Sequence, residues 1–118
     1  MELSEVVALR RDLHAHPELK FEEFRTSDTL ASVLETLGYH PVRGLAGTGV
    51  VASLVSKEPG PSIILRADMD AWSIAVKGSH PHLSRHTGKM HACGHDGHIA
   101  MLLGAASALA HYPPDGGT

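Results

Sequence analysis

Only two stretches of this 118-residue chain have the valine- and isoleucine-rich composition of β-strands, and this limits the folds open to it. They are residues 49–56 (GVVASLVS) and residues 62–67 (SIILRA), and the turn-rich sequence KEPGP lies between them. We therefore predict a hairpin of two strands. Because two strands are too few for an independent sheet, we expect this sheet to need partners that the chain does not supply.

Apolar residues at helical spacing predict two helices before this hairpin. The first lies between Ser4, its predicted N-cap, and Pro17, which ends it. The second covers residues 22–37, with Thr26 as the cap of a shorter version and Gly38 as a left-handed stop.

A third helix is predicted over residues 95–111, where apolar and small residues alternate at helical spacing. The order helix, helix, strand, strand, helix is typical of an α/β or α+β assembly. Of the two we predict α/β, with the helices packed on a small sheet.

Composition and charge exclude several classes of protein. Hydrophobic residues make up 42% and charged residues 19%, which is ordinary for a soluble folded domain. The net charge of -3 and the lack of a basic stripe argue against nucleic acid as a partner. We see no apolar span long enough for a membrane helix and no secretory signal. The single cysteine excludes an internal disulfide, so we predict a cytoplasmic protein.

Acidic residues follow the second predicted strand in the sequence ADMDA, residues 67–71. In α/β folds, ligands bind where the chain leaves the carboxyl end of a strand. On an extended chain, Asp68 and Asp70 point the same way and could share a cation or a proton. The alternative is a pair of solvated carboxylates, as for most charged residues.

A denser group of metal-binding residue types stands at the start of the last predicted helix, in HACGHDGH, residues 91–98. Cys93 and His95 are two residues apart, and Gly94 between them permits an unusual backbone angle. Because a thiolate with imidazole suits zinc or a similar transition metal, we predict a metal site here. The alternative is a buried structural cysteine with surface histidines.

The chain has ten histidines, as many as lysine and arginine together. His80, His82 and His86 lie in an irregular segment and indicate a metal site only weakly. For His14 and His16, near the end of the first predicted helix, we expect simple exposure or a favourable charge at the helix C-terminus.

Three stretches together resemble the start of the M20 family of metallopeptidases and amidohydrolases. They are RRDLHAHPELKFEEFRTSDTLASVLETLGY, IILRADMDA and GKMHACGHDGHIAMLLGAA. The branch that they resemble holds hippurate hydrolases, N-acyl-amino-acid amidohydrolases and auxin-conjugate hydrolases. The resemblance implies that residues 1–118 are an incomplete N-terminal segment of a zinc-peptidase-like α/β catalytic domain, without the family's lid or dimerisation domain.

The resemblance also implies a site with two divalent ions, often zinc, manganese or cobalt. Cys93 and His95 match metal ligands of the family, and Asp70 matches its catalytic aspartate. Asp68 takes the place of a ligand histidine of other branches. Asp96 and His98 are expected behind the ligands or on the substrate side.

The implied reaction is hydrolysis of an N-acyl amino acid or a small peptide-like amide. Metal ions activate a water and polarise the amide carbonyl, and a glutamate acts as general base. No residue here matches that glutamate or the later ligand histidines, so we expect the isolated chain to be inactive, or to need a complementing chain or a second copy of itself. Trp72 and Ser73 also stand where the family usually has Leu-Pro.

Two other functions stay open at this point. The chain could be a non-catalytic metal-binding module completed by His80, His82 or His86. It could also be a truncated interaction remnant, whose apolar faces pair with another chain.

Overall fold

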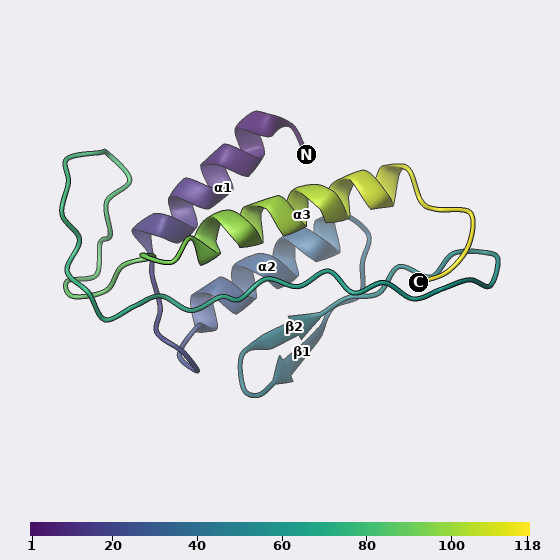
Figure 1. Cartoon of the computed structure of the whole chain (residues 1–118), viewed down its shortest axis with the longest axis horizontal. Coiled ribbons are helices and arrows are strands. Elements are labelled where there is room, and N and C mark those ends of the chain that lie inside the picture. The colour runs from purple at the N-terminus through teal and green to yellow at the C-terminus, as the bar shows by residue number, and fades with distance from the viewer.

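Three helices form a single layer, with α3 in its middle (Figure 1). The computed structural model describes residues 1–118. Helix α1 is Leu3–Ala15, α2 is Phe24–Thr36 and α3 is His95–His111. Helix α3 contacts both α1 and α2. The prediction for the third helix is confirmed at both ends, while α2 begins two residues later than the predicted residue 22.

Glutamate side chains, and not Ser4 or Thr26, serve the helix N-termini. The backbone N–H of Glu2, the N-cap of α1, donates to Glu5 Oε2 at 2.6 Å. At α2, Glu18 reaches from the preceding loop and accepts the N–H of Thr26 at 2.6 Å. Both predicted caps are therefore wrong, because a longer carboxylate side chain meets the free N–H groups first. The left-handed stop is confirmed, since Gly38 has a φ of 90°.

The hairpin lies earlier in the chain than predicted. Strands β1 (Val42–Leu45) and β2 (Gly49–Val51) pair antiparallel, with Val42 opposite Val51. Gly47 adopts a φ of 94° in the turn, and its N–H donates to Gly44 O at 3.0 Å. The glycines before residue 49 therefore form the turn itself, which makes a first strand possible at Val42–Leu45.

Residues 62–67, predicted as the second strand, run extended but pair with no strand. Ile64 is 89% exposed and Ile63 is 73% exposed. The hairpin of residues 49–56 with 62–67 is therefore wrong. The expectation that the apolar run needs partners agrees with this exposure, because an apolar strand gains stability only from the neighbours that cover it.

The hydrophobic core lies between the three helices. Its centre is Leu13 of α1, Leu30 of α2, and Ile99 and Leu103 of α3. Ala67 and Met69, at the end of the extended run, pack against this cluster. The core is small for the length of the chain, because only 19 of 118 residues are buried.

The accessible surface is correspondingly large. It measures 7522 Å², whereas a compact monomer of this mass exposes about 6,200 Å². The extended segment that follows β2 crosses the length of the helical layer in Figure 1, and part of it meets the chain end. There Ser56 N–H donates to Gly117 O and Ile63 N–H donates to Thr118 O, both at 2.9 Å. None of the helices has the length and apolar character needed to cross a membrane.

Candidate functional site

Backbone hydrogen bonds hold the segment that contains Asp70 near the segment that leads into α3. Ala71 N–H donates to Glu18 O at 2.8 Å, which ties the end of the extended run to the loop between α1 and α2. Trp72 and Met90 exchange two backbone bonds of 2.8 and 2.9 Å. The segment that leads into His91 and Cys93 is thereby fixed beside the segment that holds Asp70.

Asp70 and His95 meet through one ring nitrogen. His95 Nδ1 lies 3.0 Å from Asp70 Oδ1 and 2.9 Å from the backbone oxygen of the same residue. Because both neighbours are acceptors, Nδ1 carries the proton and donates. Nε2 of His95 then keeps its lone pair, which is the arrangement that carboxylates impose on metal-binding histidines.

Cys93 stands just before α3 with an exposed, free thiol. Gly94, the N-cap of the helix, adopts a φ of 82°, a left-handed conformation that favours glycine. Cys93 therefore stands at the N-terminus of α3, the positive end of the helix dipole. The donor types of Cys93 and His95 fit a transition metal, although the structure gathers no group of three or more His, Cys, Asp and Glu side chains that could hold one.

His91 is the buried histidine of this region. It is 4% exposed, and neither of its ring nitrogens has a hydrogen-bond partner. Burial lowers the pKa of His91, Asp96 opposes that change, and His14 and His95 lower the pKa further. His91 is therefore neutral at pH 7, and its ring nitrogens are not engaged by any group of this chain.

Asp96 is the anchor between α1 and α3. Its side chain is fully buried, and its Oδ2 accepts from Arg10 Nε at 3.0 Å and from His14 Nδ1 at 2.8 Å. The expectation of an exposed His14 is wrong, since this residue is 4% exposed. The spacing of Arg10 and His14, four residues apart on one helix face, is the signal that could have indicated this pair.

Two further predicted residues, Asp68 and His98, form no hydrogen bond or ion pair with Asp70. Asp68 does not join Asp70 but forms an exposed ion pair with Arg66 at 2.5 Å. His98 is exposed, and its ring centroid lies 6.0 Å from that of His95.

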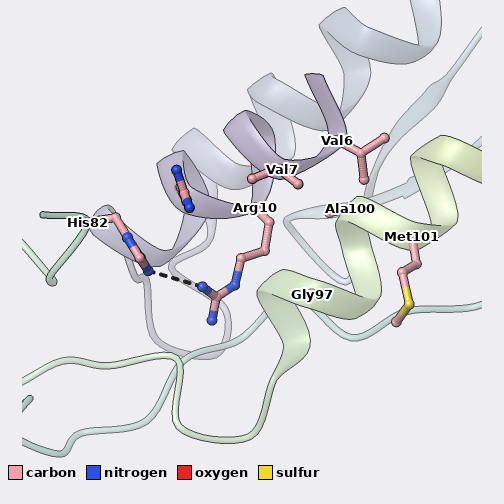
Figure 2. A pocket seen from close by; sticks show the side chains of 8 residues that line it. Val6, Val7, Arg10, His82, Gly97, Ala100 and Met101 are labelled. Atoms are coloured by element: carbon pink, nitrogen blue, oxygen red, sulfur yellow. Dashed lines mark hydrogen bonds between the residues drawn. The ribbon is translucent and has the colours of Figure 1, made fainter. Parts of the chain in front are cut away.

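A groove of about 350 Å³ lies between α1 and α3 (Figure 2). Apolar side chains form most of its walls, and the guanidinium of Arg10 lies at one end, next to His82. The lining residues that Figure 2 labels are Val6, Val7, Arg10, His82, Gly97, Ala100 and Met101. Of the predicted candidates only His82 lines it, and Asp70, Cys93 and His95 do not, so the candidate site is a surface around His95 and not this groove.

The chain is similar to known proteins over most of its length. Residues 64–118 match the model of the peptidase family M20/M25/M40. The crystal structure of the Bacillus subtilis YXEP protein, described as a dinuclear metal-binding peptidase from the M20 family, superposes on 92% of this chain with a TM-score of 0.88 at 39% identity. The chain belongs to the M20 peptidase family. The α/β fold of an incomplete zinc-peptidase-like domain is thereby confirmed.

The similarity extends to longer proteins. An N-acyl-L-amino acid amidohydrolase from Geobacillus stearothermophilus is 42% identical over 95% of this chain, and a putative glutamate–cysteine ligase 2-3 from Rhodococcus jostii is 51% identical over 92% of it. The chain spans 30% of the first and 14% of the second, and 31% of the B. subtilis structure. The chain therefore spans less than a third of the length of each of these proteins.

Proposed function

We propose that this chain is the N-terminal segment of the catalytic domain of an M20 hydrolase, with the lid domain outside it. The reaction is metal-dependent hydrolysis of the amide bond of N-acyl amino acids or small peptide-like amides. The observation that supports this most is His95, whose Nδ1 is held by Asp70 and which stands two residues after Cys93 in the chain. The amidohydrolase name of the Geobacillus relative supports the substrate class.

The Cys93 thiolate and His95 Nε2 would hold a divalent transition metal, which we propose to be zinc, manganese or cobalt. When bound, such an ion polarises an amide carbonyl and makes water more acidic. Two protein donors are fewer than the three of a catalytic zinc site, so further donors must come from outside this group. The unpaired nitrogens of His91 lie two residues from Cys93.

Asp70 acts on the site through His95. Its carboxylate and backbone oxygen fix the ring orientation and the tautomer, so that Nε2 remains a lone-pair donor. We therefore propose Asp70 as the residue that matches the family's catalytic aspartate, with a positioning action at His95.

Two glutamates near the start of α2 are held within the fold and are not available as a general base. Glu18 caps α2, and Glu23, which is 6% exposed, accepts the hydroxyl of Thr48 at 2.7 Å. Both carboxylates are engaged within the fold. We therefore propose that turnover requires a complementing chain that carries the rest of the catalytic domain, in a cytoplasmic setting where Cys93 stays reduced.

Metal stoichiometry of the purified chain tests this proposal. After dialysis against micromolar zinc, elemental analysis is expected to show near one ion per chain in the wild type. Cys93→Ser and His95→Gln should each lose it, whereas Asp68→Asn, at an exposed ion pair, should keep it. Equal metal content in wild type and Cys93→Ser would overturn the assignment of the ligands.

Activity provides the second test. The isolated chain is expected to release no amino acid from N-acetyl amino acids above the level of Cys93→Ser. Metal-dependent turnover by the chain alone would show that the missing base and ligands are not required, and it would overturn the need for a complement.

A further inference from the structure

Histidines of an irregular loop lie against the end of α1. The loop consists of residues 78–88, and its backbone is tied to the helix where Arg85 N–H donates to Ala15 O at 2.8 Å. The ring centroids of His80 and His82 are 4.3 Å apart. They lie 5.4 and 5.5 Å from the ring centroid of His14.

One hydrogen bond in this contact is possible only for a neutral imidazole. Arg10 Nη1 donates to His82 Nε2 at 3.2 Å, the dashed line in Figure 2. A guanidinium has donors only, so Nε2 must present its lone pair. A proton on that nitrogen would remove the acceptor and place two cations at hydrogen-bond distance.

We propose that residues 78–88 form an acid-released latch, held on α1 while His82 is neutral and freed when His82 takes up a proton. Arg10 is the fixed half of this contact, because its Nε is bound to the buried Asp96. The latch therefore rests on the same ion pair that joins α1 to α3.

The charges around His82 favour release at low pH. Helix α1 presents Arg10, Arg11 and His14 to the ring, and the loop presents His80. Helix α3 contributes the carboxylate of Asp96, which already accepts from Arg10 and His14. Hence an added proton on His82 meets cationic groups, and no carboxylate offsets their effect on the pKa of His82, although Oδ1 of Asp96 has no hydrogen-bond partner.

The direction of the pH effect follows from these contacts. Desolvation lowers the pKa of His82 first, and His80, Arg10, Arg11 and His14 lower it further. The released loop has the ordinary histidine pKa of about 6.5. Docking is therefore fully present above this value and weakens as the pH falls below it.

The latch lies next to the candidate site along the chain. The loop begins a few residues after Trp72 and ends just before Met90, the two residues whose backbone bonds fix Asp70 beside Cys93. After release of the loop by acid, the two backbone hydrogen bonds between Trp72 and Met90 would still hold its ends together. The latch does not depend on the proposed hydrolase function, because its contacts involve neither Cys93 nor His95.

Hydrogen–deuterium exchange of the full chain tests the latch. In peptides that cover residues 79–89, protection corrected for the intrinsic rate is expected to fall by up to tenfold per pH unit between pH 6.5 and 5.5, as for one proton. Peptides of α3 serve as the internal reference and should keep their protection. Unchanged protection of the loop at pH 5.5 would overturn the latch.

Three variants separate His82 from its neighbours. His82→Gln keeps an acceptor for Arg10 but cannot titrate, so its loop should remain protected at pH 5.5. His82→Lys carries a permanent charge and should release the loop already at pH 7.5. His40→Gln, at an exposed histidine, should behave as the wild type. The same acid response in His82→Gln as in the wild type would exclude His82 as the titrating group.

Discussion

The helical layer and the extended segment between β2 and α3 obtain their structure in different ways. In the layer, Leu13 and Ile99 are 0% exposed, and each helix satisfies its backbone hydrogen bonds within itself. In the segment, Ile63 and Ile64 are mostly exposed, and no strand of this chain pairs with them. The contrast teaches that helices of this chain are stabilised by one another, whereas its second apolar run finds no strand partner within the chain.

The largest effect should come from a matched pair of isoleucine truncations across these regions. Ile99→Ala removes buried methyl groups from the core and should lower the free energy of unfolding by about 2–5 kcal/mol. Ile64→Ala, at a side chain 89% exposed, should change it by less than about 0.5 kcal/mol. Urea unfolding followed by circular dichroism measures both. A comparable loss in the two variants would mean that residues 62–67 are covered in solution.

The next effect concerns the buried ion network that joins α1 to α3. Asp96→Asn removes the charge that Arg10 and His14 share, so the free energy of unfolding should fall by about 1–3 kcal/mol. Asp68→Asn, at the exposed pair with Arg66, should cost about 0–1 kcal/mol. The same unfolding experiment compares them. A neutral Asp96→Asn variant would contradict the anchoring role of this carboxylate.

A smaller effect is expected at the cap of α2. Glu18→Ala leaves the N–H groups of Arg25 and Thr26 without their acceptor and should destabilise the chain by about 0.5–2 kcal/mol. Glu22→Ala is the matched control, because its exposed carboxylate has no hydrogen-bond partner in the fold and its loss should be near zero. Thermal unfolding of the two variants decides whether Glu18 is the cap.

The smallest effect, and the one that depends on pH, lies at Tyr39. Its hydroxyl donates to Ala106 O at 2.8 Å, so Tyr39→Phe should cost about 0.5–1.5 kcal/mol at pH 7. Burial raises the pKa of Tyr39 above the ordinary value of 10.0. The unfolded chain then releases its proton first, so the stability of the wild type should fall as the pH rises above 10.

Unfolding measured at pH 8 and pH 10.5 checks this behaviour. Tyr39→Phe should show a smaller fall than the wild type, because it lacks the titrating group. An equal fall in both would assign the loss to other tyrosine or lysine groups of the chain.

The accuracy of the sequence predictions follows the same division between helices and strands. Residues 95–111 were predicted to the residue, since local spacing and the glycine before His95 determine a helix. The strand at Val42–Leu45 was missed, because its apolar residues are few and its partner is set by a glycine turn. The caps were missed because Glu18 reaches its helix from a loop.

In the candidate site, too, features that depend on neighbouring residues could be predicted, whereas contacts between distant residues could not. The motif around Cys93 and His95 was visible as a dense group of donor types, and it belongs to one of the three stretches that together resemble the M20 family. The burial of His14 against Asp96, 82 positions apart in sequence, had only the spacing of Arg10 and His14 as a local signal, and that spacing does not name the partner. Ring tautomers and free nitrogens are likewise properties of contacts, which only folding creates.

By itself, the sequence determined the three helices, the family and the donor types at the start of α3, because these depend on residues close together in the chain. The tertiary structure decided which donors meet. It placed Asp70 on His95 and joined Arg10 and His14 to Asp96. It also left residues 62–67 without a partner strand. A strand requires partners from distant parts of a chain, whereas a helix forms its hydrogen bonds within itself.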